Sequence, residues 1–215
     1  MIYDMQTATK TAEHLLQINA IKLSPKNPFT WASGWQSPIY CDNRVSLSFP
    51  EIRSFLAQEI ASQLTALYGR DIVIAGVATG AIGIGMLVAH QMNLPFVYIR
   101  PETKKHGRQN QIEGHLQQAS KVVVVEDLIS TGKSSLKAVD ALRSAQTEVL
   151  GMIALFTYGF PTAAENFKEA AVKLHTLSDY STLIAVAKQQ MAIDDSELEL
   201  LKKWRENPSE WTSDA

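Results

Sequence analysis

Apolar residues near the N-terminus change their spacing along the chain, and each change predicts a different kind of structure. Ala8, Ala12, Leu15 and Leu16 fall on one side of a helical wheel, which predicts an amphipathic helix. Residues 21–44 then lose this period and contain three prolines and four aromatic residues. Such a composition indicates a loop with short strands, because proline interrupts regular elements.

The rest of the chain alternates short apolar runs with helical patterns. The runs that predict strands are residues 72–75, 95–99, 122–125, 149–157 and 174–177, and the helical patterns lie near 52–60, 136–142, 183–187 and 196–204. Ser196 and Glu199 form a capping-box pattern at the start of the last helix. This alternation predicts an α/β fold with a central, mostly parallel sheet flanked by helices. Right-handed crossovers would bring the loops after the strands to one edge.

Length and composition narrow the class of protein. The chain has 215 residues, of which 46% are hydrophobic and 20% charged, as expected for one globular domain. A net charge of −2 gives no general attraction to nucleic acid or to an anionic membrane. Cys41 is the single cysteine, which excludes an internal disulfide. Without an apolar signal core or a run of about 20 apolar residues, we expect a cytoplasmic protein.

The run from residue 122 to residue 134 combines acids with a polar loop. Four valines, residues 122–125, lead into Glu126 and Asp127, and the loop Ser130–Ser134 precedes a helical pattern. Ligands of open α/β sheets bind beyond the strand ends, where two acids suit a sugar or a metal. A small-residue loop at a helix N-terminus suits a phosphate. Together these features favour a phosphorylated sugar.

Two other interpretations of this run deserve weight. It could be an ordinary strand-to-helix junction in which Asp127 or Ser130 only caps the helix. A nucleotide-binding P-loop is excluded, although Gly132, Lys133 and Ser134 match its last residues. That motif needs a glycine at position 127, where the carboxylate of Asp127 would repel a phosphate.

The whole run resembles the phosphoribosyl-diphosphate (PRPP) binding motif of type I phosphoribosyltransferases. The resemblance implies their Rossmann-like fold with a small N-terminal hood. It also implies that Glu126 and Asp127 are catalytic and hold the ribose hydroxyls, while the loop cradles the 5′-phosphate. The PRPP-binding residues implied in this run are Glu126, Asp127, Leu128, Ile129, Ser130, Thr131, Gly132, Lys133 and Ser134.

A second signal is the polar segment that follows the predicted strand 95–99. By composition alone it could be solvated surface, but its place after a strand puts it at the same edge as the acids. It resembles the catalytic loop of orotate phosphoribosyltransferases at Arg100, Lys104, His106 and Gly107. The resemblance implies that Arg100, Lys104 and His106 bind PRPP and that Lys104 is catalytic. It further implies a homodimer in which Arg100 and Lys104 reach the neighbouring subunit.

A third signal is the hood segment, residues 28–44. Its aromatic residues could serve packing alone, yet the segment resembles the orotate-specific hood of the same family. The resemblance implies orotate as the base, held by Ser130 and by backbone N–H groups. Some members carry a lysine and an arginine that contact orotate, and this chain has Ala32 and Tyr158 at those positions.

The resemblance thus implies transfer of the phosphoribosyl group from PRPP to orotate, with Mg²⁺ as cofactor and no metal ligand assigned to the protein. A phosphoribosyltransferase for another base and a non-catalytic PRPP-sensing regulator stay as alternatives, because fold alone does not decide function. We expect three parts of one domain. These are the N-terminal helix and hood (residues 1–50), the core (51–190) and a C-terminal helix (191–215).

Overall fold

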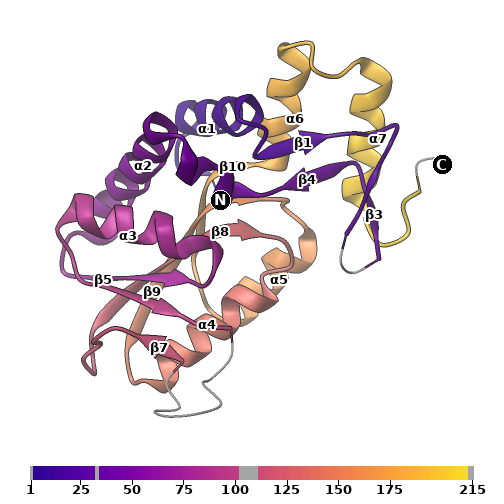
Figure 1. The fold of residues 1–215 in the computed structure, drawn as a ribbon. Coiled ribbons are helices and arrows are strands. Elements are labelled where there is room, and N and C mark those ends of the chain that lie inside the picture. The colour runs from indigo at the N-terminus through magenta and orange to yellow at the C-terminus, as the bar shows by residue number, and fades with distance from the viewer. Residues whose placement is uncertain (1, 32–33, 102–110, 213–215) are drawn as a thin grey trace.

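The computed structural model describes residues 2–31, 34–101 and 111–212 (Figure 1). The helices are α1 (Met5–Gln17), the 3-10 helix η1 (Asn43–Ser48), α2 (Pro50–Tyr68), α3 (Gly80–Met92), α4 (Lys133–Ser144), α5 (Pro161–Glu169), α6 (Tyr180–Gln189) and α7 (Asp195–Glu206). The strands are β1 (Ile21–Leu23), β2 (Phe29–Thr30), β3 (Gln36–Ser37), β4 (Ile39–Cys41), β5 (Val73–Val77), β6 (Phe96–Ile99), β7 (Ile112–Glu113), β8 (Lys121–Ile129), β9 (Glu148–Thr157) and β10 (Leu174–Asp179).

The central sheet of the described chain has the strand order β10-β9-β8-β5-β6-β7. Its neighbouring strands run parallel, except that β7 is antiparallel to β6. Helices lie on both faces (Figure 1), because a buried parallel sheet must cover two apolar surfaces. The predicted α/β fold with a mostly parallel sheet is therefore confirmed.

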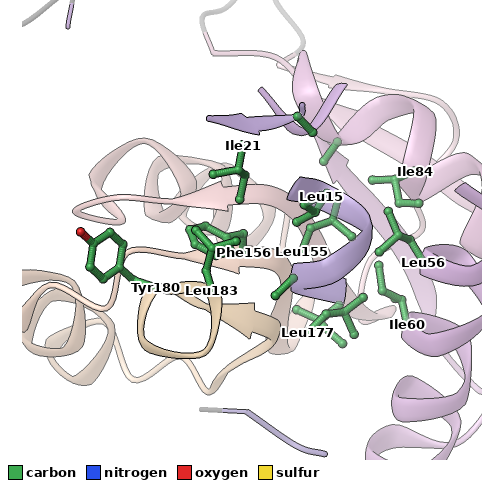
Figure 2. Packing of buried hydrophobic residues seen from close by; sticks show 14 of the residues in the cluster. Leu15, Ile21, Leu56, Ile60, Ile84, Leu155, Phe156, Leu177, Tyr180 and Leu183 are labelled. Atoms are coloured by element: carbon green, nitrogen blue, oxygen red, sulfur yellow. The ribbon is translucent and has the colours of Figure 1, made fainter. Parts of the chain in front are cut away.

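Alternation along β8 divides the core into two layers. Val123 and Val125 join the cluster formed with α1, α2, α3 and α6, part of which Figure 2 shows around Leu15 and Phe156. Val122 and Val124 join the cluster on the side of α4 and α5. Successive side chains of a strand point to opposite faces. The two acids that follow therefore leave β8 on opposite sides of the sheet.

The hood segment, together with β1 before it, forms two short antiparallel pairs outside the central sheet. Strand β1 pairs with β4, and β2 pairs with β3. Trp31 packs against the main core cluster, and its indole N–H donates a 3.1 Å hydrogen bond to the carbonyl of Ile39. Figure 1 shows these strands beside α7, so the hood and the C-terminal helix are neighbours in space.

Several element boundaries differ from those predicted from the sequence. The acids were expected after the end of a strand, but β8 continues through Ile129 and includes them. Strand β7 lies in a segment that was expected to be loop throughout. Its pairing with β6 is a long-range contact that the local pattern does not contain.

Two helices also differ from the prediction. The sequence interpretation missed α5, which buries only Ala163 and Phe167 and so leaves a weak periodic signal. The capping box of α7 uses Asp194 and Glu197 rather than Ser196 and Glu199. The side chain of Asp194 accepts from the N–H of Glu197, and Glu197 accepts from the N–H of Asp194, both within 2.9 Å. In the described ranges, no helix has the length and apolar character needed to cross a membrane.

Candidate active site

The two acids of β8 have different surroundings. Glu126 is 5% exposed, and its carboxyl group accepts a 2.7 Å hydrogen bond from the hydroxyl of Ser135 on α4 and a 2.9 Å bond from the N–H of Asp127. Burial, followed by the neighbouring charge of Asp127, raises the pKa of Glu126 from 4.5 to about 8. Glu126 is therefore largely protonated at neutral pH, whereas the opposite face of the strand presents Asp127.

Asp127 lies against the N-terminus of α3. Gly80 is the first residue of that helix, and a methyl group on its Cα would overlap the carboxylate of Asp127. The partial positive charge of a helix N-terminus favours a carboxylate at this place. The close packing of Asp127 therefore requires a residue without a side chain at position 80.

Asn43 connects the hood to the acids. Its side-chain amide donates a 2.6 Å hydrogen bond to the backbone carbonyl of Asp127, and its amide oxygen accepts from the thiol of Cys41 at 3.3 Å. The pairing of β5 with β8 extends only to Val125, so this carbonyl lies past the last β5 partner. Asn43 is 2% exposed and supplies a donor there, as a buried carbonyl requires.

The loop after β8 leads into an open helix N-terminus. Gly132 is the N-cap of α4 with φ +78°, a conformation that favours glycine, and no side-chain hydrogen bond caps this end among the described residues. Neither Asp127 nor Ser130 caps the helix, so the interpretation as an ordinary capped junction was wrong. The side chain of Asn166 donates a 2.8 Å hydrogen bond to the carbonyl of Thr131, which connects the loop to α5. The arrangement suits an anion.

A cavity of about 490 Å³ lies between this loop and the hood segment. Its described lining is mainly aromatic and consists of Thr30, Trp31, Trp35, Tyr40, Cys41, Leu128, Ser130, Thr131 and Tyr158. Ser130 and Thr131 belong to the loop Ser130–Ser134, which we call the phosphate loop, and they also line the cavity. An apolar pocket therefore lies next to a loop that suits an anion. Burial raises the pKa of Tyr158 well above 10.0, so its hydroxyl stays protonated. We call this space the base cavity.

Arg100 lies on the same sheet edge as the acids but two strands away. It follows β6, and β5 separates β6 from β8. A guanidinium nitrogen of Arg100 lies 3.6 Å from a carboxylate oxygen of Glu113 in the same chain. The backbone N–H of Arg100 donates to the carbonyl of Gln111 at 2.9 Å. Lys104, His106 and Gly107 lie outside the described residues.

The described residues of the site offer few side chains that could bind Mg²⁺ directly. The described residues contain no group of three or more His, Cys, Asp or Glu side chains arranged to hold a metal. Mg²⁺ commonly uses one or two carboxylates and completes its shell with substrate phosphates and water. Asp127 is the carboxylate available for that role, because Glu126 is buried and largely protonated. The residues therefore fit a magnesium ion whose remaining ligands are water and phosphate oxygens.

Sequence reasoning found the acids, the phosphate loop and the hood segment. The structure brings Asp127, the loop and the hood together, whereas Glu126 is buried on the other face of the sheet against Ser135. Sequence reasoning missed Asn43, Ser135 and Asn166, each of which makes a hydrogen bond to the acids or the loop. Asn43 lies within the hood segment, where a polar residue two positions after β4 was the available signal. Asn166 lies on α5, which was not predicted at all.

The known proteins that this chain resembles in sequence are phosphoribosyltransferases. The family model described as "Phosphoribosyl transferase domain" matches residues 47–190. An orotate phosphoribosyltransferase of Phocaeicola vulgatus is 54% identical over 208 residues, covering 96% of this chain and 98% of that protein. One of Listeria monocytogenes is 47% identical over 207 residues, with 96% and 99% covered.

Solved structures with a similar fold also include an orotate phosphoribosyltransferase. The orotate phosphoribosyltransferase from Aeropyrum pernix has a TM-score of 0.70 and 28% identity, covering 85% of this chain and 99% of that one. The UMP synthase of Leishmania donovani has a TM-score of 0.78 and 24% identity, covering 93% of this chain and 42% of that one, a likeness of fold. The family model matches residues 47–190, and the identity to the curated relatives extends along nearly the whole chain. The chain therefore belongs to the phosphoribosyltransferase family and, within it, to the orotate phosphoribosyltransferases.

Proposed function

We propose that this protein transfers the 5-phosphoribosyl group from PRPP to orotate, forming orotidine 5′-monophosphate and pyrophosphate in de novo pyrimidine biosynthesis. The observation that supports this most directly is the shared border of two subsites. Ser130 and Thr131 belong to the phosphate loop and also line the base cavity. A base in the cavity and a ribose phosphate in the loop would therefore lie side by side, as the transfer requires.

In the proposed reaction, a ring nitrogen of orotate forms a bond to C1 of the ribose as the bond from C1 to pyrophosphate breaks. Positive charge develops on the sugar, as in glycoside cleavage. The carboxylate of Asp127 holds a ribose hydroxyl and favours that charge. Glu126 is buried on the opposite face of the strand and, when protonated, adds no second negative charge beside Asp127. Electrons of the broken bond leave with pyrophosphate, whose oxygen also takes up the proton that the ring nitrogen loses, so the step balances without an oxidant or a covalent enzyme intermediate.

Release of pyrophosphate requires compensation of its charge. Mg²⁺, when bound, would neutralise part of the negative charge on the leaving group. Arg100, Lys104 and His106 add electrostatic stabilisation and, by resemblance, cover the site while PRPP is bound. We propose in addition that the protein is a cytoplasmic homodimer in which Arg100 and Lys104 act in the partner's site. The ion pair of Arg100 with Glu113 would then open on binding.

The aromatic residues of the base cavity favour orotate as the base, although this chain lacks the lysine and arginine that contact orotate in some relatives. Tyr158 lines the cavity as a neutral hydroxyl donor, and Trp31 and Trp35 offer flat faces for a pyrimidine. The alternative functions stay open to the same assay. A transferase for another base would ignore orotate, and a PRPP-sensing regulator would bind PRPP without consuming any base.

The deciding experiment is the ultraviolet absorbance of orotate on mixing with purified protein, PRPP and Mg²⁺. We expect a loss of orotate absorbance that requires the protein, PRPP and Mg²⁺ together. Consumption of adenine, guanine, hypoxanthine or uracil in place of orotate would contradict the assignment of the base. Saturable PRPP binding in calorimetry, with no base consumed, would favour the regulator.

A further inference from the structure

Two segments outside the family-model match meet behind the base cavity. The match covers residues 47–190, whereas Trp31 precedes it and Trp204 of α7 follows it. The centres of their rings lie 5.6 Å apart at an interplanar angle of 81°, an edge-to-face contact. Such a contact is favourable beyond the area it buries. The C-terminal helix, which the sequence did not connect to any function, thus contacts a residue of the cavity wall.

Trp204 also contacts the second aromatic residue of that wall. Its ring centre lies 5.8 Å from that of Tyr158, and the rings of Trp31 and Tyr158 are 5.3 Å apart. The three rings therefore form a triangle in which Trp31 and Tyr158 line the cavity while Trp204 stands behind them. Trp204 is 0% exposed, so its action on a bound base must pass through these two residues.

The far side of Trp204 is fixed to the core. Its ring centre lies 5.5 Å from that of Phe160 and 5.4 Å from that of Tyr180. The hydroxyl of Tyr180 donates a 2.9 Å hydrogen bond to the carbonyl of Leu201, one turn earlier on α7. The indole Nε1 of Trp204 has no hydrogen-bond partner among the described residues, so the ring contributes shape and stacking. Trp204 is thus a rigid support between the core and the cavity wall.

The exposed contacts between the same segments are a weaker connection. Lys26, before the hood segment, pairs with Asp194 at 3.2 Å and with Glu197 at 3.4 Å. The side chain of Lys26 is 58% exposed, and solvent-exposed ion pairs contribute little. The buried ring contact therefore dominates the coupling between α7 and the hood.

We propose that Trp204 is a positioning residue for the base, which it serves by holding Trp31 and Tyr158 as one wall of the base cavity. This inference rests on the proposed function, because it assigns the cavity to orotate. Loss of the indole ring would let Trp31 and Tyr158 turn into the space it leaves. The flat wall against which a pyrimidine stacks would then be lost, while the phosphate loop after β8 would keep its own contacts.

The test compares Trp204→Leu and Trp204→Phe with Leu201→Ala as a matched control. Leu201 is also fully buried on α7, but it has no ring to contact the wall. The readouts are KM for orotate at saturating PRPP, KM for PRPP at saturating orotate, kcat, and the melting temperature. Lys26→Ala is a second control that removes the exposed ion pairs alone.

We expect Trp204→Leu to raise KM for orotate about five- to twentyfold through the loss of two ring contacts. KM for PRPP should change less than about twofold, because the phosphate loop keeps its contacts. Trp204→Phe keeps an aromatic ring but a smaller one, so its orotate KM should still rise, by about two- to threefold. Leu201→Ala should lower the melting temperature with both KM values nearly unchanged, and Lys26→Ala should alter neither KM.

Three results would overturn the inference. These are an unchanged orotate KM in Trp204→Leu, a parallel rise of both KM values, or an equal rise of the orotate KM in Leu201→Ala. If Trp204→Leu does not fold, Trp204→Phe decides, and an orotate KM equal to that of the wild type then counts against the proposal. Turnover of orotate by the wild type is measured first. A failure of the proposed function is therefore seen in the wild type, and a failure of this inference only in the variants.

Discussion

The side-chain amide of Asn43 and the backbone carbonyl of Asp127 are joined by a 2.6 Å hydrogen bond across 84 positions of sequence. The bond fixes one of the two acidic residues to the segment that borders the base cavity. Cys41 lines that cavity and donates to the amide oxygen of Asn43. The same asparagine therefore connects the lining of the base cavity to Asp127.

The first prediction concerns this asparagine. Asn43→Ala leaves the carbonyl of Asp127 without its donor, which should lower the free energy of unfolding by about 1–3 kcal/mol. Because the acid is then less firmly placed, kcat/KM for PRPP should fall about tenfold or more. Urea unfolding and steady-state kinetics measure the two effects. Asn207→Ala, at an exposed asparagine, is the control and should behave like the wild type.

A second prediction concerns Gly80. In Gly80→Ala the new methyl group overlaps the carboxylate of Asp127, so the carboxylate must move from its place at the N-terminus of α3. We expect turnover to fall at least about tenfold while the protein stays folded. Gly83→Ala is the matched control on the same helix, since its methyl group would meet only the flexible side chain of Leu47. Equal turnover in the two variants would contradict the explanation.

The third prediction concerns charge on the acid itself. Asp127→Asn keeps the shape of the side chain but removes the negative charge that is proposed to hold a ribose hydroxyl and to favour the developing positive charge. We expect kcat/KM for PRPP to fall by about 10²-fold or more, because a charged group in contact with the transition state is lost. Steady-state kinetics with PRPP as the varied substrate tests this. Wild-type kinetics in the variant would rule out the role.

A fourth prediction concerns pH. The pKa of Glu126 is about 8 in the folded protein and near 4.5 when exposed, so the folded state holds a proton that the unfolded state loses between these values. The stability from this group is complete below about pH 4.5 and is lost progressively as pH rises to about 8, on the order of 4 kcal/mol in total. Glu126→Gln cannot lose a proton. Its melting temperature should therefore exceed that of the wild type at pH 8 by more than at pH 5.

Thermal unfolding from pH 5 to pH 8.5 measures this difference. Glu148→Gln removes an exposed carboxyl group from the neighbouring strand and is the control, for which the gap from the wild type should not widen with pH. A gap for Glu126→Gln that stays constant across the range would show that Glu126 titrates normally.

The fifth prediction rests on sequence resemblance. Lys104→Ala removes a cation proposed to stabilise the leaving pyrophosphate, so kcat should fall about 10²-fold or more with an unchanged melting temperature. Lys137→Ala, on the surface of α4, supplies a comparison for the loss of one positive charge. A turnover number near that of the wild type in Lys104→Ala would refute the role. Until then the assignments of Arg100, Lys104 and His106 stay predictions.

Local sequence was sufficient for the fold class and for much of the site. The valine run before Glu126 predicts a buried strand, and the small residues of 130–134 predict a phosphate loop, because both signals depend on neighbours in the chain. The same reasoning missed α5, whose buried face consists of Ala163 and Phe167. It also misplaced the capping box of α7, because Asp194 with Glu197 and Ser196 with Glu199 both match the spacing of that motif.

By itself the sequence determined that strands and helices alternate in an α/β fold, where the acids and the phosphate loop lie in the chain, and the family to which they point. Those features follow from periodicity and from short motifs. Only the tertiary structure decided that Glu126 is buried against Ser135, that Asp127 packs on Gly80 and is held by Asn43, and that Trp204 stands behind Trp31. Each of the contacts of Asp127 and Trp204 joins residues far apart in sequence. The pKa of an acid and the shape of a cavity depend on what surrounds them in space, so no local pattern contains them.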